Sequence, residues 1–322
     1  MFRILTIVTI FLSFFFSDAA DTPIIGILSQ ETYSVRKYLE DDAVSSFIAA
    51  SYVKYVESAG GRVVPIWIGQ REEYYQRVVN YTNGIIFPGG ATYFNETAGY
   101  GEAAKILYRL AVKANKEGIY YPIWGTCLGM EVFAFAILGE DIRVDCDLHK
   151  VAIPLEFSNG YEKSKLMGNA SDDVIHNLKN DNVTYNQHRY CLTESVMKEN
   201  NLLNDWKILA TNLDNNKLEF ISMMESIKYP FYGVQFHPEK NQFEFKQNVG
   251  IPHTPEAIKI SQYFGNFFVN ECRQNGNAFP DHNLEQRSLI YNYSPVYTGI
   301  KNSAYEQIYQ FTNNDFVNNQ LE

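Results

Sequence analysis

Short, nearly continuous apolar runs alternate with amphipathic segments over the first half of the chain. Apolar runs of this length are typical of buried parallel strands, and apolar residues spaced by three and four are typical of helices. The pattern predicts strands at residues 23–28, 62–68, 84–87 and 120–124. It predicts helices at residues 44–59, 72–81, 98–117 and 128–138. Because strands and helices alternate at the spacing of βαβ units, we expect a parallel sheet.

After Gly139 the pattern changes to short apolar segments separated by polar turns. These segments predict strands at residues 149–156, 183–188, 206–211, 217–224 and 231–236. A helix is predicted at residues 254–272, with Thr254 as its N-cap. The chain is rich in Asn, Gln and Tyr from about residue 300, so we expect residues 301–322 to form a peripheral polar tail. No repeat or linker interrupts the pattern, which indicates one α/β domain.

The first twenty residues have the layout of a secretory signal peptide. Arg3 precedes an apolar run at residues 4–16, and small residues follow for cleavage after Ala19 or Ala20. The alternative is a membrane anchor, but the run is shorter than the roughly 20 residues that span a bilayer. No later stretch is long and apolar enough to span a membrane, so we expect a secreted or lysosomal protein.

Five N-x-S/T sequons agree with passage through the secretory pathway. They begin at Asn80, Asn95, Asn169, Asn182 and Asn292. Each is a weak signal alone, because an Asn-rich chain produces some by chance. The C-terminus carries no Lys-Asp-Glu-Leu retention signal, so retention in the endoplasmic reticulum is not indicated.

Composition and charge exclude several classes of protein. The 322 residues include 27 Lys and Arg against 37 Asp and Glu, a formal net charge of −10. A nucleic-acid binder would need a basic face, so we expect no nucleic-acid partner. Hydrophobic residues make up 46% of the chain, enough for a sizeable core, and four Cys are too few for a disulfide scaffold.

Residues 124–129, Trp-Gly-Thr-Cys-Leu-Gly, join a predicted strand to a predicted helix. Glycines two residues before and after Cys127 predict the sharp turn of a nucleophile elbow, where a larger side chain would clash. The helix N-terminus should favour the Cys127 thiolate, and the Leu128 N–H is placed to stabilise an oxyanion. The alternative is an inert buried Cys beside a Gly-rich turn, so a second element is needed.

Residues 232–239, Tyr-Gly-Val-Gln-Phe-His-Pro-Glu, supply a candidate base. His237 follows a buried strand, and Glu239 is placed to orient its imidazole. Strand ends meet at one edge of a parallel sheet, so these groups can reach Cys127. Imidazole also has the right pKa for proton transfer near neutral pH. The alternative is a surface histidine in a turn.

Residues 85–90, Ile-Ile-Phe-Pro-Gly-Gly, run from a predicted strand into a tight turn. The Gly90 N–H could complete an oxyanion hole with the N–H of Leu128. Taken alone, this motif favours a plain βα turn.

The remaining cysteines leave their pairing open. Cys146-x-x-His149 and His188-x-x-Cys191 form a mirrored pair that superficially suits zinc, but the 38 residues between them disfavour a zinc site. A disulfide between any two of Cys146, Cys191 and Cys272 is possible, because the sequence does not give connectivity. We expect no metal site.

Together the three motifs resemble the class I glutamine amidotransferase-like superfamily, and within it the gamma-glutamyl hydrolase family. Further matching stretches lie at residues 49–60, 220–225 and 289–299, so the resemblance covers roughly residues 23–300. It implies a three-layer α/β/α sandwich around a mostly parallel sheet, with a catalytic domain at residues 21–300. It also implies folate poly-γ-glutamate as substrate, a thioester acyl-enzyme, no cofactor and a homodimer.

The resemblance also implies roles for individual residues. Cys127 would be the nucleophile, His237 the proton donor and acceptor, and Glu239 the group that orients His237. His188 lies where the family has a second active-site histidine, but its segment departs from the family's Asn-Phe-His-Lys pattern. The alternative for His188 is a strand histidine with satisfied hydrogen bonds.

The substrate tail carries several carboxylates, which predicts cationic residues around the site. Arg36, Lys37, Lys163 and Arg189 are available, but each one taken alone is better explained as solvated surface charge.

Two other functions remain open. A cytosolic glutaminase subunit is disfavoured by the signal peptide, and a non-catalytic binding protein is disfavoured because Cys, His and Glu are all present.

Overall fold

A computed structural model of the chain describes residues 20–313 and 315. Residues 1–19 of the predicted signal peptide and the end of the predicted tail lie outside the described residues. Within those residues, every helix is too short or too polar to cross a membrane.

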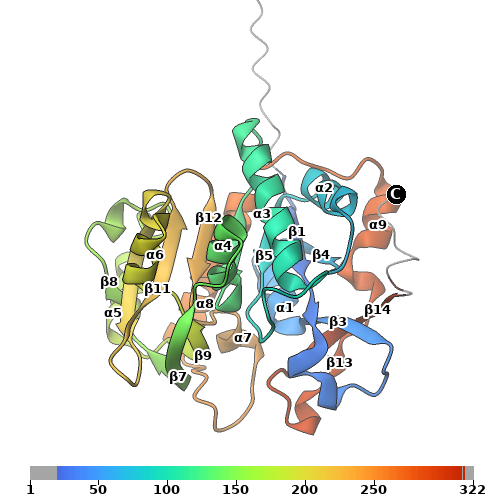
Figure 1. Cartoon of the computed structure of the whole chain (residues 1–322). Helices are drawn as coiled ribbons and strands as arrows, with labels where there is room; N and C mark the ends of the chain where they lie inside the picture. The colour runs from blue at the N-terminus through green and yellow to red at the C-terminus, as the bar shows by residue number, and fades with distance from the viewer. Residues whose placement is uncertain (1–19, 314, 316–322) are drawn as a thin grey trace, which may run out of the picture.

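An eight-stranded sheet forms the centre of the molecule, in the order β4-β1-β5-β6-β12-β11-β10-β8 (Figure 1). The first five strands are parallel: β4 (Arg62–Ile66), β1 (Ile24–Leu28), β5 (Gly84–Phe87), β6 (Ile123–Thr126) and β12 (Phe231–Val234). The other three are antiparallel to their neighbours: β11 (Glu219–Ser226), β10 (Trp206–Leu213) and β8 (Glu156–Phe157). The carboxyl ends of the parallel strands therefore share one edge.

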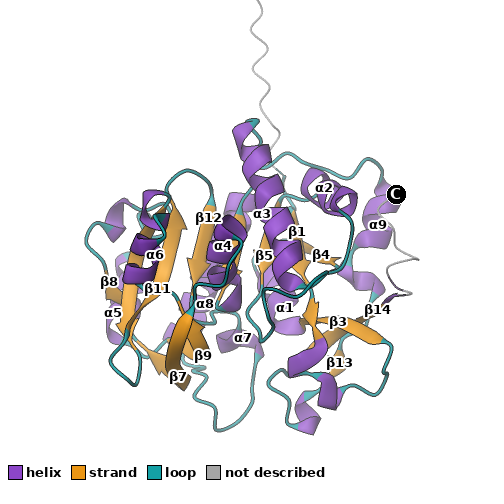
Figure 2. Ribbon diagram, in the orientation of Figure 1, coloured by secondary structure: helices purple, strands orange, loops and turns teal. Residues whose placement is uncertain are grey.

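Helices cover both faces of this sheet (Figures 1 and 2). On one face pack α2 (Glu72–Tyr81), α3 (Tyr100–Lys116) and α4 (Leu128–Leu138). On the other pack α1 (Ala50–Ser58), α5 (Asp172–Asn180), α7 (Lys240–Phe243) and α8 (Pro255–Cys272). Two shorter helices, α6 (Glu194–Glu199) and α9 (His282–Ser288), lie at opposite sides of the molecule. The expected three-layer sandwich is confirmed.

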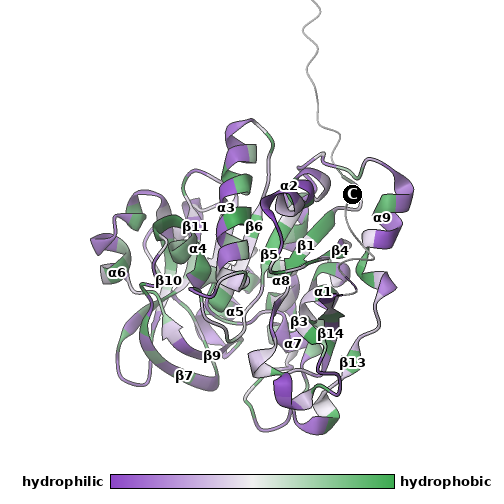
Figure 3. Ribbon diagram, turned by 45° about the vertical axis from the view of Figure 1, so that its right-hand side comes forward, coloured by the Kyte–Doolittle hydropathy of each residue, from purple (hydrophilic) through white to green (hydrophobic). Residues whose placement is uncertain are grey.

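The apolar core explains why most predicted elements are found. Strands β1 and β5 are fully buried, and their side chains are hydrophobic (Figure 3). The helices at residues 72–81 and 128–138 have the predicted boundaries. Helix α8 begins as predicted, because the Thr254 hydroxyl accepts a hydrogen bond from the Ala257 N–H at 3.2 Å.

The prediction of one helix at residues 44–59 is wrong in its first part. Residues Val44–Ala49 form strand β3, and α1 begins only at Ala50. Strand β3 lies in a second sheet, in the order β13 (Val296–Tyr297), β14 (Gln307–Thr312), β3 and β2 (Gln30–Glu31). A strand that is buried on both faces can have the same apolar spacing as one side of a helix. The spacing therefore does not tell a strand from a helix here, whereas the pairing with the distant strand β14 does.

The structure also corrects the expectation of a peripheral tail from residue 301. Strand β14 pairs antiparallel with β3, and Ile308 lies opposite Ala49. Ile308 and Phe311 are fully buried although polar residues surround them in the sequence. The packed domain therefore continues past residue 300 through β14.

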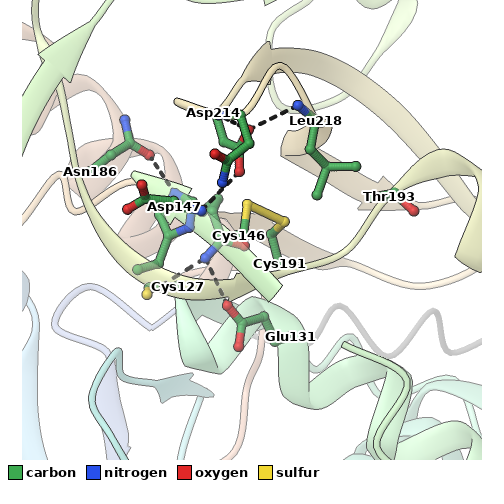
Figure 4. The surroundings of a disulfide bond; sticks show 12 residues. Cys127, Glu131, Cys146, Asp147, Asn186, Cys191, Thr193, Asp214 and Leu218 are labelled. Carbon is green, nitrogen blue, oxygen red and sulfur yellow. Dashed lines mark hydrogen bonds between the residues drawn. A yellow bond between two sulfur atoms is a disulfide. The ribbon is translucent and has the colours of Figure 1, made fainter. Parts of the chain in front are cut away.

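A two-stranded antiparallel sheet of β7 (Val144–Ile153) and β9 (Thr184–Cys191) completes the fold, and β8 and α5 lie between its two strands in the chain. A disulfide joins Cys146 to Cys191, while Cys127 and Cys272 are free and buried (Figure 4). The disulfide decides the cysteine pairing that the sequence left open. It also means that Cys146 and Cys191 are not free to bind zinc as thiolates. Among residues 20–313 and 315, no group of three or more His, Cys, Asp or Glu side chains is placed to hold a metal ion.

Candidate active site

Cys127 occupies the sharp turn between β6 and α4. Its backbone has φ 52° and ψ −113°, a strained conformation for a residue with a side chain. The Cys127 N–H donates to the Val234 carbonyl at 2.7 Å, and the Cys127 carbonyl accepts from Met130 and Glu131 at 2.9 and 3.0 Å. These bonds hold the strained turn in place, as expected for a nucleophile elbow.

The two glycines beside Cys127 are required by space. A Cβ atom on Gly125 would collide with the carbonyl of Gly129, and one on Gly129 would collide with the carbonyl of Phe87. Neither glycine has a positive φ. The G-x-C-x-G spacing therefore lets α4 pack directly against β5 and β6.

His237 and Glu239 form a buried pair just after β12. His237 Nδ1 lies 2.8 Å from Glu239 Oε1, and the side chains are 7% and 1% exposed. The His237 N–H donates to the Tyr185 carbonyl of β9 at 2.9 Å. Burial lowers the pKa of His237, and Glu239 only partly opposes this. Burial alone would raise the pKa of Glu239, but the bonded His237 holds it below its usual range.

The turn after β5 brings the cysteine and the histidine together. A Cβ atom on Gly89 would lie 2.6 Å from His237 Cε1 and 3.1 Å from Cys127 Cβ. The Gly89 N–H donates to the Tyr52 hydroxyl at 2.7 Å. In the described part of the chain, the next N–H, that of Gly90, has no hydrogen-bond partner. The three sequence motifs thus converge at the carboxyl edge of the sheet.

The surroundings of the thiol differ from the sequence expectation. Burial and the carboxylate of Glu131 raise the pKa of Cys127 well above its usual value, and the Leu128 N–H only partly opposes them. Gln235 Nε2 lies 3.6 Å from the Cys127 sulfur and 2.8 Å from Glu131 Oε1. The resting thiol is therefore neutral, because desolvation outweighs the helix N-terminus. His237 is neutral as well and able to accept its proton.

His188 lies on β9, close to the group formed by Cys127, His237 and Glu239. It is 5% exposed, and its Nε2 is 3.3 Å from Asn186 Oδ1, while its buried Nδ1 has no hydrogen-bond partner. Burial, and after it the charge of His237, lowers the pKa of His188 to about 3. His188 is therefore neutral and incompletely bonded, unlike a satisfied structural histidine.

Among the described residues, no contact joins the four candidate cations to Cys127, His237 or Glu239. Arg36 pairs with Asp42, Lys37 lies over the ring of Tyr38, and Lys163 and Arg189 are exposed. Sequence reasoning instead missed Tyr52, Gln235 and Lys240. Gln235 lies within the histidine motif, and Lys240 directly follows it. Only burial distinguishes Gln235 from an ordinary strand residue and Lys240 from an ordinary surface residue.

Comparison with known proteins agrees with this arrangement. Residues 23–239 match the family described as peptidase C26. The chain is 41% identical to Homo sapiens gamma-glutamyl hydrolase over 295 residues, which cover 91% of each protein. It is 40% identical to Dictyostelium discoideum gamma-glutamyl hydrolase B over 94% of this chain and 88% of that protein.

A plant relative extends the match. Arabidopsis thaliana gamma-glutamyl hydrolase 1 is 33% identical over 90% of this chain and 83% of that protein. The resemblance predicted from the three motifs is confirmed: the chain belongs to the peptidase C26 family, together with the gamma-glutamyl hydrolases.

Proposed function

We propose that this protein hydrolyses the γ-glutamyl amide bonds of folate poly-γ-glutamates, with Cys127 as nucleophile. The observation that carries the proposal is the convergence of Cys127 and the His237–Glu239 pair on the turn at Gly89. The names of the relatives supply the bond type, and the family resemblance supplies the folate substrate.

In the first step His237 accepts the thiol proton, and the Cys127 sulfur attacks the γ-amide carbonyl carbon. The thiol is neutral at rest, so this transfer has to accompany the attack. The N–H groups of Leu128 and Gly90 stabilise the oxyanion, and each such donor contributes about 3 kcal/mol.

In the second step the His237 imidazolium donates its proton to the departing amine, and the C–N bond breaks. Glutamate or a shorter polyglutamate leaves, and the acyl group remains on Cys127 as a thioester. His237 then takes a proton from water, which attacks the thioester carbon, and the sulfur leaves as thiolate and regains the proton. Glu239 holds the imidazole orientation and stabilises its cationic form throughout. This sequence of steps uses no metal or organic cofactor.

We further propose that His188 contacts the substrate through its unpartnered Nδ1. Because burial keeps this imidazole neutral, it can donate or accept a hydrogen bond without adding a charge beside His237.

We also propose that the protein is secreted or reaches the lysosome or vacuole. The Cys146–Cys191 disulfide supports this, because disulfides persist in oxidising compartments. All five sequon asparagines are exposed, as glycosylation requires.

On the family resemblance we propose a homodimer, and exposed apolar side chains at Tyr291, Tyr297 and Ile300 are compatible with one. Light scattering of the purified protein measures its oligomeric state.

Mass spectrometry of products from a folate pentaglutamate tests the activity. Wild type and Cys127→Ala are compared, with free glutamine as a control substrate. We expect chain shortening by wild type that is lost in the variant, and the product ladder gives the cleavage position. Intact pentaglutamate together with ammonia release from glutamine would favour a glutaminase, and no turnover of either would favour a binding protein.

A further inference from the structure

Lys240 is a buried cation that the mechanism does not use. It directly follows Glu239, opens helix α7 and is only 7% exposed. Lysine is almost never buried to this extent unless it is paired. Yet within residues 20–313 and 315, no carboxylate oxygen lies within 4.0 Å of its ammonium and no acceptor bonds to it.

An aromatic ring from the C-terminal segment holds this ammonium in place. Lys240 Nζ lies 4.8 Å from the centre of the Tyr305 ring, a cation–π contact. The backbone of Tyr305 is fixed by Ser303, whose hydroxyl accepts from its N–H at 3.2 Å, and by Thr298, whose hydroxyl donates to its carbonyl at 2.8 Å. The ring also packs against Phe47, with 5.7 Å between the ring centres, and its contact with Lys240 leaves the ammonium free to bind an anion.

The position of Lys240 is within electrostatic reach of the reacting groups. Its backbone N–H donates to the His237 carbonyl at 3.3 Å. Burial dominates the pKa values of Cys127, His237 and Glu239, and the charge of Lys240 lowers all three.

Neighbouring carboxyl groups do not neutralise Lys240. Glu239 is bonded to His237, and Glu244 accepts the Glu306 N–H at 2.6 Å. Burial also raises the pKa of Glu244, which weakens its charge as a counterion. Lys240 lowers the pKa of both carboxyl groups without contacting either, so its ammonium has no bonded counterion, and an anionic ligand at this point would be bound favourably.

We propose that Lys240 binds the α-carboxylate of the γ-glutamyl residue whose carbonyl Cys127 attacks. This inference rests on the proposed function. In a poly-γ-glutamate chain that residue keeps a free α-carboxylate a few bonds from the scissile carbonyl. Lys240 is thus a specificity residue, which distinguishes a γ-glutamyl group from an uncharged acyl group of the same length.

A pair of matched substrates tests this proposal. One is a γ-glutamyl amide with a free α-carboxylate, and the other carries an α-carboxamide in its place. We expect wild type to prefer the carboxylate by about tenfold to a hundredfold in kcat/KM, mainly through KM. In Lys240→Met the preference should fall to about one, because the variant lacks the charge that distinguishes the two substrates, whatever it does to the turnover common to both.

Lys179→Met is the matched control, because Lys179 also lies over aromatic rings, 5.0 Å from the centre of Tyr161, but belongs to α5. It should keep the full preference. If Lys240→Met does not fold, Lys240→Gln replaces it in the same comparison. Equal hydrolysis of both substrates by wild type, or a preference retained without Lys240, overturns the proposal. Hydrolysis of neither substrate by wild type overturns the proposed function instead.

Discussion

Two regions meet at the carboxyl edge of the central sheet, and they are built in different ways. The parallel half (β5, β6, α4 and β12) presents Cys127, His237 and Glu239 from short segments that directly follow strands. The covering half (the β7–β9 sheet and the second sheet) presents His188 and, from the segment between β13 and β14, Tyr305. Strands β5, β6 and β12 lie in the interior of the eight-stranded sheet, whereas the β7–β9 sheet has only two strands.

Because of this difference, we expect the two halves to contribute differently to activity and to stability. The proposed reacting groups sit at the ends of fully buried strands, where the backbone is fixed by the sheet itself. The β7–β9 sheet consists of two strands only, and an isolated pair of strands is marginally stable. The Cys146–Cys191 disulfide supplies a constraint that the sheet does not provide there. Changes in the parallel half should therefore reduce activity, and changes in the covering half should chiefly reduce stability.

The largest effect is expected for Glu239→Gln in the parallel half. The amide cannot stabilise the imidazolium and favours the wrong tautomer, so kcat should fall by about a thousandfold or more. Steady-state kinetics on a γ-glutamyl substrate measures this, and thermal unfolding checks that the fold is kept. Activity within tenfold of wild type would remove Glu239 from the proposed mechanism.

The double variant Cys146→Ala, Cys191→Ala tests the covering half. The disulfide closes a separation of 45 residues, so its removal should lower the free energy of unfolding by about 4 kcal/mol. Urea unfolding with and without reductant measures the loss, and reductant should then have no further effect. Cys272→Ala, at a free and buried cysteine, is the control and should lose less. A double variant as stable as wild type would contradict the comparison.

A smaller effect on activity is expected for Gly89→Ala. The added methyl group would lie 2.6 Å from His237 and 3.1 Å from Cys127, so one of them has to move. Displacement of a reacting group by about 1 Å costs roughly a hundredfold in rate. Unchanged kinetics in the folded variant would show that the turn does not set the distance between Cys127 and His237.

The effect that is smallest near neutral pH is a pH dependence of stability from His188. The unfolded chain binds a proton at this residue below about 6.5, whereas the folded protein does so only near 3. The free energy of unfolding should therefore decrease as the pH falls from about 6.5 toward 3, by at most about 1.4 kcal/mol per pH unit. His188→Asn should reduce this slope. Equal slopes in wild type and variant would exclude His188 as the cause.

The parallel half could be predicted because its motifs are local. The helices at residues 72–81 and 128–138, the N-cap at Thr254 and the elbow at Cys127 each follow from a few adjacent residues. The covering half could not be predicted in the same way. Strand β3 resembled a helix and β14 resembled a polar tail, because the two pair with each other across a large separation in the chain.

The sequence by itself determined the elements of the parallel half, the identity of the Cys-His-Glu group and the family of the protein. These depend on short-range periodicity, turn geometry and motif spacing, which neighbouring residues encode. Only the tertiary structure decided the Cys146–Cys191 pairing, the neutral thiol of Cys127 and the burial of Lys240. Each of these depends on which distant segments exclude water from a group, and desolvation is a property of the packed molecule.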